Sequence, residues 1–284
     1  MRSPSTRQIP IYSHTMQKII DAHCHIYPDA IARKAVSAVD KFYDGLPEDH
    51  CDGTIASLHA VGSAAGIRHY IVHSVATKPE QVHSINAFIA GSAAASGGAF
   101  TGLGTLHPDS ADQRGDFEAL RALGLRGVKL HPDIQRFPVD DPRVMDIFAL
   151  CEAAGLPVCV HTGDYRYDYS NPNRVVNVLR AFPKLKFIGA HLGGWSVWDA
   201  AARRLPDFPN MWVDTSSSFR WLTPERSLDI LRAYGSKRVM FGTDYPMWTP
   251  RPDIDHLQSL DLTDDEREDI LWRTCARLFE IEIQ

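Results

Sequence analysis

Short apolar segments alternate with longer amphipathic segments along most of the chain. The short segments have the length and composition of buried strands, and we expect strands at 18–25, 69–75, 99–106, 126–131, 157–161, 186–191, 210–215 and 238–243. The longer segments predict helices at 29–43, 54–66, 79–96, 112–123, 141–154, 173–181, 197–204, 224–234 and 264–278. Alternating strands and helices indicate a parallel sheet. Eight such units predict that the sheet closes into a (β/α)8 TIM barrel, an α/β fold.

The length of the chain suits this fold, because 284 residues are close to the roughly 250 that a single barrel needs. Residues 1–15 contain Ser, Pro and Arg but no apolar stretch of the kind found in a signal peptide. We expect these residues to form a loose N-terminal arm, with Met16 as a candidate start. Residues 16–284 are expected to form a single TIM-barrel catalytic domain.

Charge and composition exclude several classes of protein. The net charge of -5 and the lack of a Lys/Arg cluster argue against nucleic-acid binding. No apolar run approaches the roughly 20 residues of a membrane span. The five cysteines are scattered and lack metal-type spacing, which favours a reducing, cytoplasmic compartment. The expected partner is a small-molecule substrate, and Trp221 and Trp248 are candidates for an interface in a homodimer.

Polar residues that can bind a metal stand where the expected strands end. His23 and His25 close the first strand and share one face, whereas Cys24 points to the other. Three further residues end later strands in the same way: His161, His191 and Asp244. The carboxyl ends of barrel strands meet at one mouth, where such enzymes keep their chemistry. Two adjacent imidazoles are half of a metal site, and the later residues supply candidates for the other half.

Five segments in order carry a resemblance to a known family. They are Asp-Ala-His-Cys-His-Ile-Tyr-Pro at 21–28, Gly-Val-Lys-Leu-His-Pro at 127–132, Val-His-Thr-Gly at 160–163, Gly-Ala-His-Leu-Gly-Gly at 189–194 and Phe-Gly-Thr-Asp-Tyr-Pro at 241–246. Together they resemble the amidohydrolase superfamily, specifically the amidohydrolase-related branch that includes aminocarboxymuconate-semialdehyde decarboxylase-like enzymes. The resemblance extends from about Lys18 to Ile281.

The resemblance implies a TIM barrel with one divalent ion, usually zinc. Its implied ligands are His23, His25, His161 and Asp244, and His191 matches a histidine that supports the ligands or takes part in catalysis. The physical chemistry agrees, because zinc favours imidazole nitrogen with carboxylate oxygen and a catalytic site leaves a position for water. The ion lowers the pKa of that water to about 7, and Asp244 suits the roles of ligand and general base.

Lys129 has two open interpretations. It shares a strand face with His131. In binuclear members of the superfamily, a lysine of the fourth strand is carboxylated and bridges two ions. Alternatively, Lys129 is a cation that holds a substrate carboxylate. We favour a single ion.

Structural roles compete with these assignments. His23 and His25 could be polar residues at the start of a loop, His161 and Asp244 could cap helices, and His191 could make a structural hydrogen bond. His107 and His131 each precede a proline, so a turn is as good an explanation as a functional role. We expect packing for His73, and a supporting role for Asp21. Cys24 and Cys159 are expected to face the helix layer or barrel wall. The remaining histidines are expected at the surface: His14, His50, His59, His69, His83 and His256.

Loops after the strands supply candidates for substrate binding. We expect four arginines to ring the metal and to hold an anionic substrate: Arg136, Arg166, Arg220 and Arg251. Trp248, Lys129 and His131 are expected to contact the substrate as well.

These features predict a metal-dependent hydrolase of the amidohydrolase type. Metal-bound hydroxide would attack a small, carboxylated amide, ester or lactone, with Asp244 moving the proton. The alternative is metal-dependent non-oxidative decarboxylation of an unsaturated or aromatic carboxylic acid. A third possibility is a non-enzymatic barrel with a vestigial site, against which the intact set of ligands argues.

Overall fold

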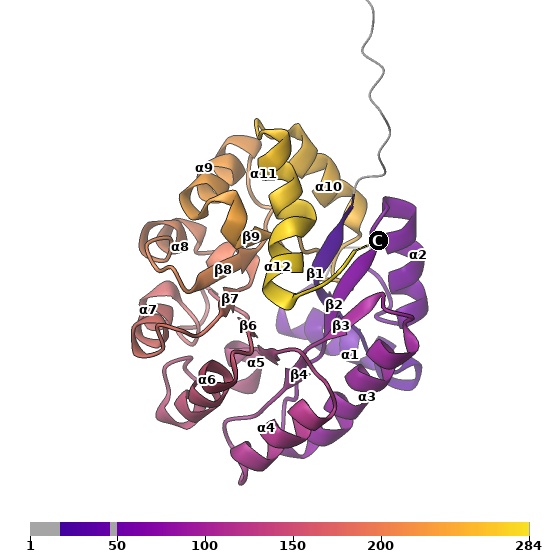
Figure 1. The fold of residues 1–284 in the computed structure, drawn as a ribbon, viewed down its shortest axis with the longest axis vertical. Coiled ribbons are helices and arrows are strands. Elements are labelled where there is room, and N and C mark those ends of the chain that lie inside the picture. The colour runs from indigo at the N-terminus through magenta and orange to yellow at the C-terminus, as the bar shows by residue number, and fades with distance from the viewer. Residues whose placement is uncertain (1–17, 46–49, 284) are drawn as a thin grey trace, which may run out of the picture.

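The computed structural model describes residues 18–45 and 50–283, which form a ring of parallel strands surrounded by helices (Figure 1). Two hydrogen-bonded sheets follow one another around the ring, in the orders β1-β2-β3 and β4-β5-β6-β7-β8-β9. Their strands are β1 (Ile20–His25), β2 (His69–His73), β3 (Phe100–Gly102), β4 (Gly104–Thr105), β5 (Val128–Leu130), β6 (Val158–Val160), β7 (Phe187–Gly189), β8 (Met211–Asp214) and β9 (Val239–Met240). The expected arm over residues 1–15 lies outside the described residues.

The two sheets meet within one barrel strand. β3 and β4 are separated only by Leu103, whose N–H donates to Val72 in β2 at 2.9 Å. The next N–H, that of Gly104, donates at 2.9 Å to Gly127, which leads into β5. At the other seam, Cys24 forms a parallel bridge with Tyr245. The ring is therefore closed, and the predicted (β/α)8 barrel is confirmed.

The helices follow the predicted alternation. They are α1 (Asp29–Phe42), α2 (Ile55–Ala65), η1 (Pro79–Gln81), α3 (Val82–Ala95), α4 (Gln113–Ala122), α5 (Pro132–Gln135), α6 (Pro142–Ala154), α7 (Pro172–Ala181), η2 (His191–Gly193), α8 (Trp198–Arg204), α9 (Pro224–Tyr234), η3 (Ser236–Arg238), α10 (Pro250–Ser259), α11 (Asp264–Glu268), the π-turn η4 (Asp269–Arg273) and α12 (Thr274–Phe279). The expected helix 264–278 is thus interrupted by η4.

Helix α10 was not expected, because Pro250 and Pro252 resemble loop residues. Both prolines lie in the first turn of the helix, where a backbone N–H has no acceptor within the helix. Proline is therefore tolerated there, and the sequence signal was misread.

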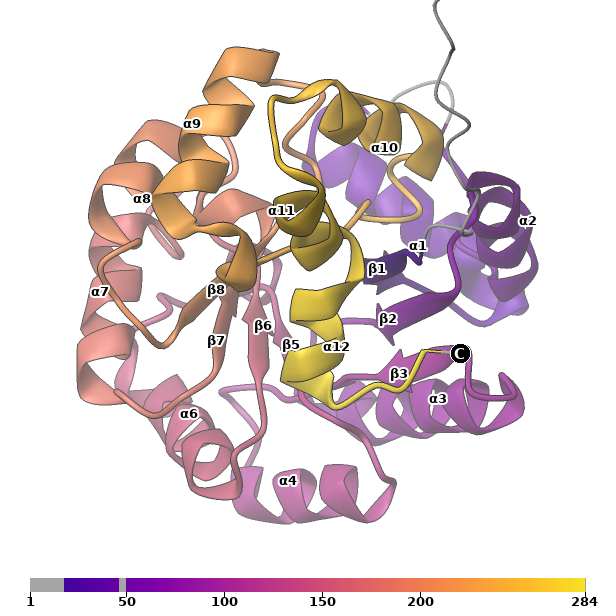
Figure 2. The same cartoon turned by 45° about the horizontal axis from the view of Figure 1, so that its top comes forward.

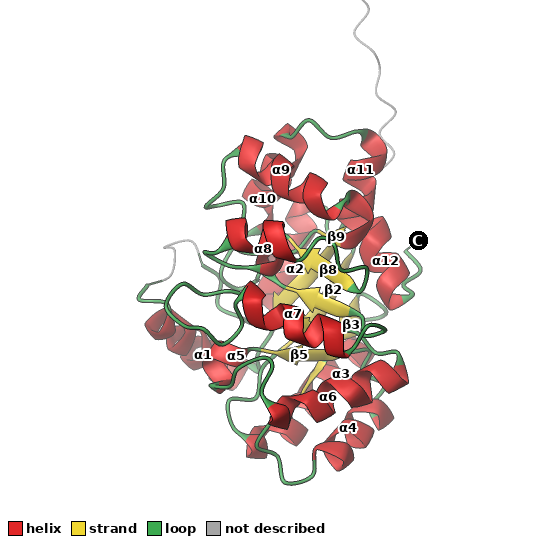
Figure 3. Ribbon diagram, turned by 90° about the vertical axis from the view of Figure 1, so that its left-hand side faces the viewer, coloured by secondary structure: helices red, strands yellow, loops and turns green. Residues whose placement is uncertain are grey.

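Apolar side chains fill two layers. Outward-facing residues of the strands pack against the helices, and Cys24 lies in this layer as expected. A smaller cluster inside the barrel joins Ile20, Ile71 and Cys159 to Leu278 of α12. Helix α12 crosses one end of the ring, whereas α1 and α5 lie on the opposite side of the strands (Figures 1 to 3). One end of the barrel is therefore sealed by apolar contacts, which leaves the carboxyl ends of the strands for chemistry.

Two expectations about buried residues are wrong. Cys159 faces the barrel interior because it lies two residues before His161 on the same face of the strand. His69 was expected at the surface, but it is buried in β2, and its Nε2 lies 2.9 Å from the hydroxyl of Thr101 on β3. All five cysteines are buried. None of the helices in the described ranges is long and apolar enough to cross a membrane.

Candidate metal centre

Three of the four predicted ligands meet at the open end of the barrel. Nε2 of His23 and Nε2 of His25 lie 3.3 Å apart. Oδ1 of Asp244, which follows β9, lies 3.3 Å from the first nitrogen and 3.5 Å from the second. Zinc bonds of 2.0–2.1 Å in a tetrahedral site separate the ligand atoms by about 3.3–3.4 Å. The triangle formed by His23, His25 and Asp244 therefore fits a divalent ion.

Asp214, at the end of β8, determines which nitrogen His23 presents. Nδ1 of His23 donates to Oδ2 of Asp214 at 2.9 Å, and both side chains are buried. Burial, together with the neighbouring charge of Lys129, lowers the pKa of His23 well below its usual range, so the ring is neutral. Its Nε2 is then the unprotonated nitrogen, and it accepts from Nζ of Lys129, a hydrogen bond that a bound ion would replace. Asp214 was not among the predicted site residues, although it stands at the end of a predicted strand as they do.

Asp214 is itself held by several donors. Its Oδ1 accepts hydrogen bonds from the backbone N–H groups of His191 and Ser216, each at 3.1 Å. The Ser216 hydroxyl donates to the same oxygen. These bonds hold the carboxylate in place, which in turn sets the orientation of the His23 ring.

His161 and His191 form a second pair of imidazoles, each of which presents an unprotonated nitrogen. Nε2 of His161 donates to the carbonyl of Gly163 at 3.1 Å, and Nδ1 of His191 donates to that of Ser216 at 3.0 Å. Burial lowers the pKa of His191 to about 4 and that of His161 well below its usual range. Their remaining nitrogens are therefore unprotonated, yet they lie only 2.9 Å apart. This distance is shorter than the roughly 3.3–3.4 Å between two ligand atoms of one tetrahedral zinc ion, so the pair does not have the spacing of two ligands of the same ion.

His161 is placed differently from the other predicted ligands. It approaches the triangle beside His191, whose ring centroid lies 5.2 Å from that of His23. His161, His191, His25 and Asp244 all line one cavity. All four predicted ligands are thus gathered at the same mouth.

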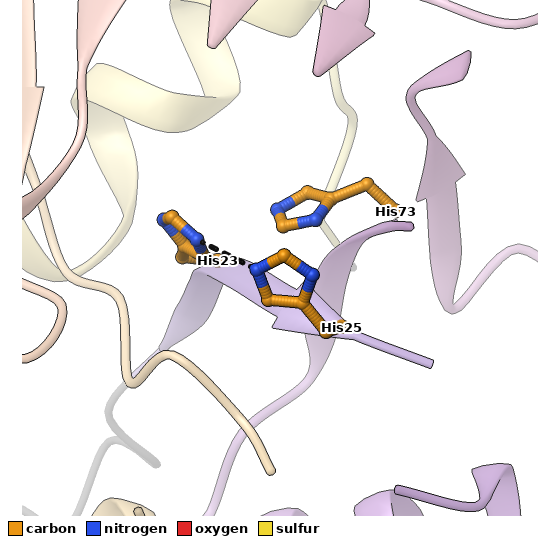
Figure 4. A group of neighbouring side chains, drawn as sticks. All are labelled: His23, His25 and His73. Atoms are coloured by element: carbon orange, nitrogen blue, oxygen red, sulfur yellow. Dashed lines mark hydrogen bonds between the residues drawn. The ribbon is translucent and has the colours of Figure 1, made fainter. Parts of the chain in front are cut away.

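His73, for which we expected only packing, lies against the histidine pair (Figure 4). It ends β2, and its ring centroid lies 4.7 Å from that of His23 and 4.4 Å from that of His25. The ligand atoms of these three histidines all lie within 4.8 Å of one another. Within the described part of the chain, neither buried ring nitrogen of His73 has a hydrogen-bond partner. A histidine near the end of a predicted strand was a signal for a site residue, but packing was predicted for His73.

Lys129 and His131 reach the site from β5 and its end. Nζ of the fully buried Lys129 donates to Nε2 of His23 at 3.1 Å and lies 3.7 Å from Sγ of Cys159. The His131 ring stacks on His161, with centroids 3.9 Å apart and an interplanar angle of 7°. Its Nδ1 also accepts from the N–H of Ile134, so His131 caps α5 as the following proline indicated. Lys129 and His131 both line the cavity.

Three site residues have left-handed backbone conformations. The φ angles are 60° at His191, 46° at Ser217 and 68° at Asp244. For residues other than glycine, such conformations cost on the order of 1–3 kcal/mol each and occur mainly at functional sites. Ser217 donates to Oδ2 of Asp244 at 2.6 Å and accepts from Nε1 of Trp248 at 2.8 Å. Trp248, which we expected to touch substrate, instead supports the carboxylate through Ser217.

The structure places only one of the four expected arginines, Arg136, on the cavity. Arg166 pairs with Asp164 at 2.8 Å, because the carboxylate lies two residues away on the same loop. Arg220 pairs with the buried Asp253 at 3.3 Å and stacks over Trp248. Arg251 is exposed and donates to the carbonyl of Ala64. These three side chains are thus not part of the cavity lining, although Arg166 lies behind it, over the rings of Phe42 and Tyr43.

The cavity has a volume of about 830 Å³ and opens above the candidate metal ligands. Its floor contains His25, Lys129, His161, His191 and Asp244. Burial raises the pKa of Asp244 to about 6, although the hydrogen bond from Ser217 acts to lower it. The site therefore combines neutral imidazoles, a carboxylate able to exchange a proton near neutral pH, and a buried lysine.

Histidines and an aspartate at the open end of a TIM barrel are typical of a class of metal-dependent enzymes. The family model described as Amidohydrolase matches residues 20–281, so the chain belongs to the amidohydrolase family, as the resemblance predicted. Three solved structures share the fold. An uncharacterised TIM-barrel protein from Bordetella bronchiseptica is 22% identical, with a TM-score of 0.79 over 93% of this chain and 98% of its own.

The other two structures come from proteins with different named activities. A dihydroxybenzoic acid decarboxylase from Polaromonas sp. JS666, with bound manganese, is 15% identical, with a TM-score of 0.69 over 93% of this chain and 97% of its own. A putative 2-pyrone-4,6-dicarboxylic acid hydrolase from Pseudomonas putida is 17% identical, with a TM-score of 0.63 over 95% and 99%. At these identities the likeness establishes the fold, and the family includes hydrolases and decarboxylases.

Proposed function

We propose that the chain is a metal-dependent hydrolase that acts on a carboxylated amide, ester or lactone, with one divalent ion, Zn²⁺, as cofactor. The observation that carries this proposal is the triangle of His23, His25 and Asp244, whose ligand atoms have the spacing of a tetrahedral zinc site. His161 is proposed as the fourth ligand, since its unprotonated Nδ1 lies at the same mouth. When bound, the ion would polarise a substrate carbonyl and lower the pKa of a water molecule.

The protein supplies proton transfer and orientation. Asp244 is the proposed base, because its carboxylate lies beside the candidate ligand nitrogens and can accept a proton and return it to the leaving group. Ser217 holds the second oxygen of Asp244, so the carboxylate is already oriented before substrate binds. His191 lies beside His161 and is proposed to help polarise the substrate carbonyl.

A carboxylate on the substrate is supported by Lys129. This lysine is fully buried, and among the described residues no carboxylate oxygen lies within ion-pair distance of its Nζ. A buried ammonium is costly unless it is paired, so an anionic substrate group would stabilise it. Arg136 and His131 provide further contacts on the cavity wall.

The second candidate function is non-oxidative decarboxylation of an unsaturated or aromatic acid. It is favoured by the position of Asp244 at the ligand triangle, because a protonated carboxyl there can deliver its proton to the carbon that loses carbon dioxide. The decarboxylase named above shares the fold. The two reactions use the same ligands and differ in the bond that breaks.

The test is a panel of carboxylated esters, lactones, amides and aromatic acids incubated with zinc- or manganese-loaded protein in ¹⁸O-labelled water. Hydrolysis predicts one labelled oxygen in the product and no carbon dioxide. Carbon dioxide without label in the organic product would replace hydrolysis with decarboxylation. No turnover across the panel, with metal bound, would overturn both. Four buried free thiols support the proposed cytoplasmic location: Cys24, Cys151, Cys159 and Cys275.

A further inference from the structure

Helix α1 has two apolar faces, one packed on the barrel and the other lining the cavity. Ala32 and Val36 are buried against the barrel. A second set follows the spacing i, i+4, i+7, i+11 and therefore forms one continuous stripe along the helix: Ile31, Ala35, Ala38 and Phe42. All four members of this stripe line the cavity. Ile31 at one end of the stripe remains 50% exposed, whereas Phe42 at the other end stacks with Tyr167.

The facing wall of the cavity is apolar as well. Ile85 and Phe88 project from α3, Ile134 comes from α5, and Met247 follows β9. The stripe on α1 and these four side chains enclose the space above the metal ligands. An apolar chamber of this kind indicates a ligand with an apolar body.

The volume of the chamber exceeds what a small planar acid occupies. At roughly 30 Å³ for each group of the size of water, the nine non-hydrogen atoms of benzoate fill about 270 Å³. The cavity measures about 830 Å³. A minimal aromatic acid at the metal therefore leaves about two thirds of the space unused, along the stripe of α1.

The charges around the chamber favour an anion. Lys129 lies in the floor, and Lys34 and Arg136 line the walls. Among the described residues that line the cavity, Asp244 is the sole carboxylate. Anionic and apolar recognition are thus combined in one cavity.

We propose that the substrate is an amphiphilic carboxylate, with its reacting group at the metal ligands and an extended apolar body of roughly ten or more non-hydrogen atoms against α1. This inference rests on the proposed function for the position of the reacting group. The apolar body distinguishes the expected substrate from a small, wholly polar acid.

Binding of 4-n-alkylbenzoates, from methyl to octyl, to zinc-loaded protein tests the proposal by calorimetry. Each added methylene is expected to lower Kd by about threefold to fourfold over several steps, the equivalent of about 0.8 kcal/mol for a buried methylene. Ala38→Trp places a large side chain in the chamber and should abolish this gradient. Ser37→Trp is the matched control, because Ser37 is exposed on the same helix but does not line the cavity.

A Kd that does not change with chain length overturns the proposal, as does an equal effect of the two tryptophan variants. Failure of the proposed function gives a different pattern. In that case the chain-length gradient persists, but neither the alkylbenzoates nor the corresponding esters and lactones are turned over. If short carboxylated substrates are turned over but Kd does not change with chain length, the proposed function stands and the proposal of an apolar substrate body fails.

Discussion

Asp214 accepts a hydrogen bond from Nδ1 of His23 at 2.9 Å and so joins the end of β8 to the end of β1. The bond places the imidazole proton away from the cavity and leaves Nε2 for a metal. A carboxylate that orients a ligand histidine in this way also raises its basicity. Metal affinity is therefore expected to depend on a residue that does not itself reach the ion.

Asp214→Asn should weaken metal binding by roughly 10- to 100-fold, the usual loss when such a supporting carboxylate is replaced. The amide has nearly the same volume, so the fold should persist. Competition with a chromogenic chelator measures the affinity, and Asp229→Asn, on the exposed surface of α9, is the control. Unchanged affinity in the Asp214 variant would show that His23 is oriented by other contacts.

Metal analysis should find about one divalent ion per chain. His23→Ala, His25→Ala and His161→Ala should each lose most of it, because a site with four ligands tolerates the loss of one poorly. His107→Ala is the matched control, a buried histidine beyond β4 that does not line the cavity. Two ions per chain would instead support a carboxylated Lys129 that bridges them. Full metal content in folded His23 and His161 variants would refute the assignment.

Asp244→Asn should reduce turnover by at least about 100-fold while changing the melting temperature little. The amide oxygen can still contact a metal, but it cannot accept the proton that general-base catalysis requires. Steady-state kinetics with metal content measured on the same sample checks this. Activity within about tenfold of the parent protein would remove Asp244 as the base.

Arg136→Gln should weaken binding of a carboxylate substrate by about 10-fold or more, because a charge-assisted hydrogen bond contributes roughly 1.5–3 kcal/mol. Arg251→Gln should have no effect, since Arg251 is exposed and away from the cavity lining. Paired measurements with a neutral methyl ester test the cause. If the ester binds the parent protein as tightly as the acid, the cavity selects by shape instead of charge.

Asp253 on α10 should make stability depend on pH. Burial raises its pKa to about 7, whereas the carboxyl of the unfolded chain titrates near 3.8. Between these values the folded state binds more protons, so the contribution of Asp253 to the free energy of unfolding is fully present below about pH 4 and falls as pH rises to about 7.

Asp253→Asn should remove that dependence, with a change of about 1 kcal/mol per pH unit in this window. Urea unfolding at pH 4.5, 5.5 and 6.5 measures it. Asp255→Asn, at an exposed position of the same helix, is the control. Parallel stability profiles for the parent protein and the Asp253 variant would contradict the assignment.

The order of strands and helices was readable from the sequence because it depends on local spacing of apolar residues. The same spacing located the candidate site, since His23, His25, His161 and Asp244 end strands, and in a closed parallel barrel those ends converge whatever the loops do. The family resemblance added the roles, and the structure brought the four residues to one mouth.

Only the tertiary structure decided which partners the side chains take. Arg166 and Arg220 stand on the expected loops, yet they pair with Asp164 and Asp253 and are not part of the cavity lining. The proton on His23 is placed by Asp214, which lies 191 residues further along the chain. Likewise, a role in ligand binding for the second apolar face of α1 follows only from its position on the cavity wall. The pairs Arg220–Asp253 and His23–Asp214 join residues far apart in sequence, so local periodicity does not predict them, and they form when the barrel closes.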